Sequence, residues 1–188
     1  MLEAKDIFIR MDGLDAIGSA TKRWKAGMDI PYLARKARFV PATDLPYYAS
    51  SFVRSRIHRV LSSDKRLAFW GPKLDNMQEL LKKHTLEEIC ALQWKRCVNE
   101  ASGFFAHASR ERWIEVGYED FVRHPREELD RILDFLGLDI PGPARDEAVS
   151  GVSPHSLGKG RSALDEGTRN RLWPLIQDTI TRFGYHAC

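Results

Sequence analysis

Hydrophobic residues along the chain follow two different periods, and each period predicts a different kind of element. The short apolar run Asp6-Ile7-Phe8-Ile9-Arg10 is typical of a buried β-strand, and Asp12-Gly13 ends it. Asp12 or Asp15 can then cap a helix that runs to about Gly27. A strand that passes directly into a capped helix is the first organising feature of this sequence.

The rest of the chain is dominated by apolar residues at helical spacing. Thr85-Leu86-Glu87-Glu88 has the form of a capping box and predicts a long helix to about His107. A further helix is expected from Asp44 through an apolar stripe that includes Phe52 and Leu61, and another from His124-Pro125 to Gly137. Shorter or later helices are expected over 76–84, near 143–149 and over about 165–183. Residues 150–162 are expected to form a Gly/Ser-rich loop.

The second strand candidate is Arg112-Trp113-Ile114-Glu115-Val116-Gly117, which leads into Tyr118-Glu119-Asp120. The predicted elements follow the order of an α/β layered protein with a parallel sheet: a strand, a helix, a long helical segment, a second strand and a further helix. Two strands are too few for a complete sheet, so we expect an incomplete parallel sheet with predominantly helical content. Residues 1–188 contain no linker or repeat and are expected to form one domain.

Charge is unevenly distributed. Residues 22–66 hold eleven Lys/Arg against three Asp, which makes this segment about +8 although the chain as a whole is +3. The segment either serves an anionic partner or is the solvated face of amphipathic helices. No apolar stretch is long enough for a membrane span, and residues 1–13 lack the pattern of a secretory signal.

The chain has three cysteines, an odd number. Cys90 and Cys97 are seven residues apart in a predicted helix, so they share one face and are expected to be buried small hydrophobes. Together with the lack of a membrane span and of a secretory signal, this favours a reducing, cytoplasmic setting. No metal site is predicted.

Three sequence features can carry chemistry. Arg10 stands at the end of a strand just before a helix start, where its guanidinium and the free N–H groups of the helix can hold a phosphate, and Ser19 can add a hydroxyl. The alternative is that Arg10 is simply an exposed residue at a strand end. Tyr118 follows the second strand, where it can stack on a base or pack in the core. Lys159-Gly160-Arg161 is either a phosphate-binding loop or an ordinary surface loop.

The order of these features resembles that of sulfotransferases that use 3′-phosphoadenosine 5′-phosphosulfate (PAPS). The Arg10–Ser19 segment resembles the 3′-phosphate segment of that family. Residues 112–137, RWIEVGYEDFVRHPREELDRILDFLG, resemble its strand, Y-E-D and helix ending in F-L-G. Phe183-Gly184-Tyr185 resembles its terminal L-G-Y, and the middle of the chain, including Trp70-Gly71-Pro72, looks most like bacterial members.

The resemblance implies a P-loop nucleotide-binding-like three-layer fold and a sulfuryl transfer from PAPS to a hydroxyl or amine, releasing PAP. Arg10 and Ser19 would bind the 3′-phosphate, Tyr118 would contact the adenine, and Lys159, Gly160 and Arg161 would close over the 3′-phosphate. The segment reads R-M-D-G-L-D where the family has R-D-G-R-D, so Arg10 is one residue farther from Ser19 and Leu14 replaces a basic residue. Either the strand end bulges or Arg10 is not the ligand.

The family's 5′-phosphosulfate loop, of the form P-K-S-G-T-T, has no match in the 188 residues, and no catalytic residue is assigned. Without the strand that bears this loop, the opening strand is expected to expose an apolar edge that a second copy or an N-terminal segment would cover. The expected acceptor is a small molecule, carbohydrate or lipid. Two alternatives stay open: a non-catalytic 3′-phosphonucleotide-binding or interaction module, and a nucleic-acid-binding protein that uses residues 22–66, although no nucleic-acid motif is present.

Overall fold

The computed structural model describes residues 4–25 and 71–185, together with positions 41, 43, 44, 46, 47 and 50. Most of the helix expected from Asp44 to Leu61, and most of the basic segment 22–66, lie outside the described residues. Among the described residues, no helix combines the length and apolar character that crossing a bilayer requires.

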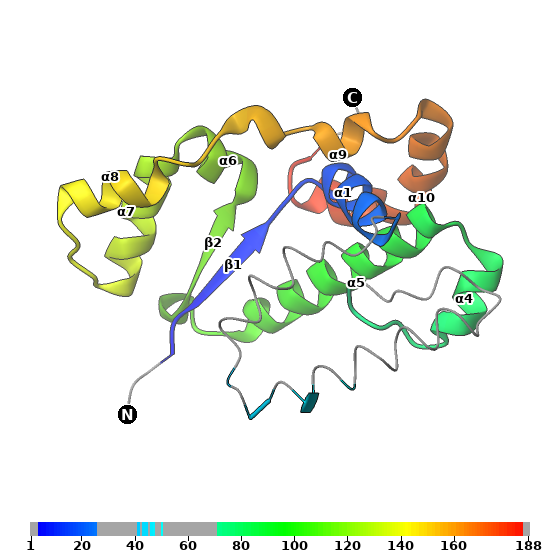
Figure 1. Cartoon of the computed structure of the whole chain (residues 1–188), viewed down its shortest axis with the longest axis horizontal. Helices are drawn as coiled ribbons and strands as arrows, with labels where there is room; N and C mark the ends of the chain where they lie inside the picture. The colour runs from blue at the N-terminus through cyan, green and yellow to red at the C-terminus, as the bar shows by residue number, and fades with distance from the viewer. Residues whose placement is uncertain are drawn as a thin grey trace.

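Within the described residues, two parallel strands form a sheet: β1 (Asp6–Arg10) and β2 (Trp113–Gly117). Their register sets Asp6 opposite Trp113 and Arg10 opposite Gly117, so both strands end at the same edge of the sheet (Figure 1). Both predicted strands are therefore confirmed, as is the α/β class with an incomplete parallel sheet and mostly helical content.

The two faces of β1 differ in how well they are covered. Phe8 is 9% exposed and packs against Phe105, with ring centroids 5.2 Å apart. Ile7 and Ile9, on the opposite face, are 39% and 62% exposed. The sequence predicted an exposed edge, not an exposed face, for this strand, and among the described residues β1 pairs with β2 alone.

The main core lies where three helices meet: α1 (Gly13–Lys25), α5 (Leu86–His107) and α10 (Glu166–Arg182), with the short α4 (Met77–Lys83) against α5. Asp12 caps α1, because its Oδ1 accepts a hydrogen bond of 2.9 Å from the Asp15 amide. The predicted capping box is confirmed: Thr85 and Glu88 exchange side-chain and backbone hydrogen bonds. Among the described residues, those with no exposed surface in this core are Ile17, Ile89, Ala91, Leu172, Ile176 and Ile180.

A second group of helices follows β2: α6 (Tyr118–Arg123), α7 (Pro125–Leu136) and α8 (Gly142–Val149). In Figure 1, α7 and α8 lie on the opposite side of the strands from α1, α9 and α10. Gly137 ends α7 with φ +70°, as the sequence predicted, because glycine adopts this left-handed conformation without strain.

Three sequence expectations are wrong in detail. Cys90 is buried, but Cys97 is exposed, although both lie on the same face of α5. Residues 150–162 are not a continuous loop: they include a 3₁₀ turn, η2 (Pro154–Ser156), and a short helix, α9 (Lys159–Ser162). A further 3₁₀ turn, η1 (Arg110–Arg112), precedes β2, at the position where the sequence had begun the strand.

Candidate functional site

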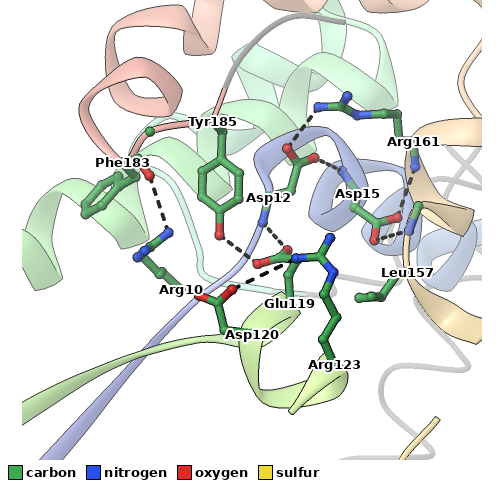
Figure 2. A pocket seen from close by; sticks show the side chains of 12 residues that line it. Arg10, Asp12, Asp15, Glu119, Asp120, Arg123, Leu157, Arg161, Phe183 and Tyr185 are labelled. Atoms are coloured by element: carbon green, nitrogen blue, oxygen red, sulfur yellow. Dashed lines mark hydrogen bonds and ion pairs between the residues drawn. The ribbon is translucent and has the colours of Figure 1, made fainter. Parts of the chain in front are cut away.

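A cleft of about 500 Å³ lies at the carboxyl end of the sheet, between the start of α1, α6, the α9 turn and the end of α10 (Figure 2). It brings Arg10 and Arg161 to one cavity, although they are far apart in the sequence. Three guanidinium groups and four carboxylates line it, so the cleft carries no net positive charge. The charged lining residues are Arg10, Arg123, Arg161, Asp12, Asp15, Glu119 and Asp120.

Within this cleft Arg10 has protein partners. Its Nε forms an ion pair with Glu115, and its Nη1 donates a 3.3 Å hydrogen bond to the Phe183 carbonyl. Burial disfavours the charged form of Arg10, but the hydrogen bond and charge of Glu115 outweigh burial and raise the pKa of Arg10. The strand-end arginine therefore joins β2 and the end of α10 to β1.

Asp15 holds the α9 turn in place. Its buried carboxylate accepts hydrogen bonds from the backbone amides of Gly158 (2.9 Å), Gly160 (2.5 Å) and Arg161 (3.1 Å). Clustered amides at a helix start form an anion site, and here an internal carboxylate occupies it. The Arg161 side chain is also paired, through a 2.9 Å contact between its Nη2 and Asp12 Oδ2.

Gly160 has a packing role that the sequence did not reveal. A Cβ at Gly160 would lie 2.0 Å from the carbonyl oxygen of Asp15, and a Cβ at Gly18 would lie 1.9 Å from the carbonyl oxygen of Gly160. Two glycines therefore allow α1 and α9 to touch backbone to backbone. The contact lies between the Arg10 cleft and a second cavity, which Gly18 and Gly160 themselves line.

Tyr185 and Glu119 complete the Arg10 cleft. The Tyr185 hydroxyl donates a 2.7 Å hydrogen bond to Glu119 Oε2, and the Asp12 amide donates one of 2.7 Å to Glu119 Oε1. Burial, followed by the bond to Glu119, raises the pKa of Tyr185 far above its usual value. Sequence reasoning named Glu119 and Asp15 only as helix caps; the contacts of Asp15 span 143 to 146 residues, and no local pattern encodes them.

A second, cationic cleft of about 330 Å³ lies between α1 and α9. Ser19 and Lys159 both line it, so two of the predicted ligands meet there despite a separation of 140 positions in the printed sequence. Among the described lining residues every charged side chain is basic. These residues are Gly18, Ser19, Lys22, Arg23, Ser156, Lys159, Gly160 and Ala163.

Tyr118 lies beside this cationic cleft. Its hydroxyl is 3.4 Å from Ser156 Oγ, a long contact, and it lines a third cavity of about 460 Å³ with Phe121. Ser156 and Lys159 line both this cavity and the cationic cleft, so the two are neighbours. An aromatic wall thus adjoins a basic one.

The six predicted binding residues are therefore divided among three cavities. Arg10 and Arg161 line one; Ser19, Lys159 and Gly160 line another; Tyr118 lines the third, next to the second. Within residues 4–25 and 71–185, no cluster of three His, Cys, Asp or Glu side chains is arranged to hold a metal ion.

Two comparisons with known proteins found similarities. Residues 51–142 match the model of the sulfotransferase family. A solved structure, "Sulfotransferase Domain from the Curacin Biosynthetic Pathway", aligns with the whole chain and 56% of its own length, at 16% identity and a TM-score of 0.49. This chain thus spans little more than half the length of that domain. Over residues 51–142, just under half of its length, the chain is thus similar to the sulfotransferase family.

Proposed function

We propose that this protein binds PAPS and takes part in transferring its sulfuryl group to a hydroxyl or amine acceptor, leaving PAP. The observation that carries the proposal is the meeting of Ser19 and Lys159 in one cationic cleft beside Tyr118. The family match supports the reaction class.

The cationic cleft suits the 3′-phosphate better than the Arg10 cleft does. A phosphate dianion gains from ammonium groups and hydroxyl donors, and Lys22, Lys159 and Ser19 supply both. In the Arg10 cleft the same phosphate would face Asp12 and Glu119. We therefore propose Ser19, Lys22 and Lys159 as the phosphate contacts, while Arg10 and Arg161 hold the fold around them.

Tyr118 is the proposed adenine contact. It is half-buried at the carboxyl end of β2, and Phe121 adds a second ring to the same cavity. Bases stack on such rings, and ligands of parallel α/β sheets dock at this edge. The neighbouring cavities would place the base and the 3′-phosphate of one nucleotide on either side of Ser156.

The transfer itself breaks the sulfur–oxygen bond to the 5′-phosphate and forms a bond from sulfur to the acceptor atom, whose proton must pass to a base. We assign neither that base nor the contacts of the sulfuryl end. The acceptor is proposed as a small molecule, carbohydrate or lipid, and the free thiols of Cys90 and Cys97 support a cytoplasmic setting.

Isothermal titration calorimetry with PAP, and with AMP as the control ligand, tests the nucleotide site. We expect PAP to bind more tightly than AMP, and Lys159→Ala to weaken PAP about fivefold, as the loss of about 1 kcal/mol at an exposed ion pair implies. Lys82→Ala, an equal charge change on α4, should leave PAP binding unchanged. Equal affinity for PAP and AMP would reject the proposal.

A further variant distinguishes the two clefts. If the 3′-phosphate lies in the cationic cleft, Lys22→Ala weakens PAP as Lys159→Ala does. If it lies in the Arg10 cleft, Arg123→Ala, which removes an exposed cation there, weakens PAP instead. PAP binding without sulfuryl transfer to any acceptor would favour the non-catalytic nucleotide-binding module.

The bare face of β1 supports a further proposal, that a second copy of the chain covers it. Ile9 is 62% exposed on a strand that pairs, within the described residues, with β2 alone. Size-exclusion chromatography with light scattering should show a dimer, which Ile9→Lys should shift toward monomer. A stable monomer of the unaltered chain would contradict this assignment.

A further inference from the structure

An apolar cavity of about 440 Å³ lies between α1 and α5, against the turn at Gly71-Pro72. On α5 its wall follows one helical face, since Cys90, Trp94 and Cys97 are spaced four and three residues apart. Small residues on α1 leave the space open. The main lining residues are Ala16, Ala20, Pro72, Cys90, Trp94 and Cys97.

The polar groups in this wall do not change its apolar character. Burial raises the pKa of Cys90 to about 11, so its thiol is neutral near pH 7. Partial burial, and then the charge of Glu100, raise the pKa of Cys97 as well. Gln93 donates a 2.7 Å hydrogen bond from Nε2 to the Pro72 carbonyl, which holds the turn against α5. The cavity has the size and lining of a site for a small apolar group.

One end of this cavity borders the cationic cleft. Ser19 and Arg23 line both cavities, and because they are four residues apart on α1 they form a ridge between them. Lys22 and Lys159 lie on the cationic side of that ridge and are exposed. An apolar compartment and a basic compartment therefore meet across one turn of helix.

We propose that the two compartments together bind one dissolved amphiphilic anion. Its apolar body fills the α1–α5 cavity, and its carboxylate or sulfate head crosses the Ser19 ridge to Lys22 and Lys159. Apolar burial provides most of the affinity, and the lysines select a charged head over a neutral one. Because the head occupies the place proposed for the 3′-phosphate, such a ligand competes with the nucleotide. The site thus goes beyond the proposed transfer reaction and gives the protein a second class of ligand.

Decanoate is the probe. Decanol, which has the same chain and a neutral head, is the control for the charged head, and acetate, which has the head without the long chain, is the control for the chain. The readout is protection of Cys97 from N-ethylmaleimide, measured on the Cys97 peptide by mass spectrometry. Cys97 is suited to this because it is both exposed and part of the wall. We expect decanoate to slow modification saturably and at several-fold lower concentration than decanol, and acetate to give no protection.

Two substitutions test the two compartments separately. Ala16→Leu fills the apolar cavity and should weaken decanoate at least tenfold, whereas Ala106→Leu on the exposed face of α5 should not. Lys22→Ala should weaken decanoate two- to fivefold and leave decanol unchanged, and Lys82→Ala is the matched charge control. Circular dichroism confirms that each variant is folded before it is compared.

Equal protection by decanoate and decanol, or protection that Ala16→Leu leaves intact, would overturn the proposal. The proposal would also be overturned if phosphatidylglycerol vesicles protect Cys97 and dissolved decanoate does not. In that case the ligand would be a membrane surface. The proposed nucleotide site is judged separately. If decanoate protects Cys97 but PAP does not bind, the proposed function fails and the amphiphile site stands; if both bind, decanoate should raise the apparent Kd of PAP.

Discussion

Replacing Asp15 with alanine should be among the most damaging single changes in this protein. The carboxylate is 3% exposed and accepts three backbone hydrogen bonds from Gly158, Gly160 and Arg161. Each amide left without an acceptor in a buried site costs about 1–3 kcal/mol, and the three share one carboxylate, so we expect a total loss of about 4 kcal/mol. Domains of this size are stable by only about 5–15 kcal/mol.

Urea unfolding followed by tryptophan fluorescence measures this loss. Asp165→Ala is the matched control, because Asp165 also accepts from a backbone amide, that of Thr168 at 2.8 Å. Its other hydrogen bond, from the Thr168 hydroxyl, likewise stays within the first turn of α10. Losing such a cap costs about 1 kcal/mol. Asp15→Asn, which keeps the shape and one acceptor oxygen, should fall between the two. If Asp15→Ala is no more destabilising than Asp165→Ala, Asp15 does not hold the α9 turn.

Two further predictions follow from the same cleft. Gly160→Ala should destabilise the protein by about 3 kcal/mol, because the added Cβ would lie 2.0 Å from the Asp15 carbonyl oxygen. Gly142→Ala is the control: its added Cβ would meet no atom within 4 Å, so the urea midpoint should change little. Equal midpoints for the two variants would contradict the close contact at Gly160. Tyr185 keeps its proton in the folded state above about pH 10, where the unfolded chain loses it, so the free energy of unfolding should fall as pH rises through that range. Tyr185→Phe should flatten this fall, and thermal unfolding of both proteins at about pH 9 and about pH 11 measures the difference; parallel pH dependences would show that Tyr185 titrates normally.

Local chemistry made much of the fold predictable. Thr85 and Glu88 form their capping box within four residues, and Gly137 ends α7 through its own backbone conformation. The strand ending in Arg10 could be recognised because the short apolar run Ile7-Phe8-Ile9 needs no distant partner to be identified as a strand. Elements whose cause lies within one or two turns were therefore found from the sequence.

The site was only partly predictable, because its causes lie far apart in the chain. The sequence placed Gly160 in a Gly/Ser-rich loop, whereas it lies in the short helix α9 and is packed against Gly18, a contact that no local pattern encodes. The sequence also treated Lys159 and Arg161 as one group, but the short α9 helix directs their side chains into different clefts. Cys97 shares its helical face with Cys90, yet it is exposed where it borders an open cavity, although its neighbour Val98 is buried.

The contacts that close the Arg10 cleft can form only late in synthesis of the chain, because they join its first strand to residues near the end of α10. Arg10 reaches Phe183, and the loop that this contact closes spans 173 residues. At about 5–20 residues per second, roughly 9–35 s pass between translation of these two residues. Throughout that interval the growing polypeptide already contains the apolar Ile7-Phe8-Ile9 run, and the turn that completes its surroundings does not yet exist. The nascent chain should therefore depend on holding chaperones most strongly in the period before α10 is made.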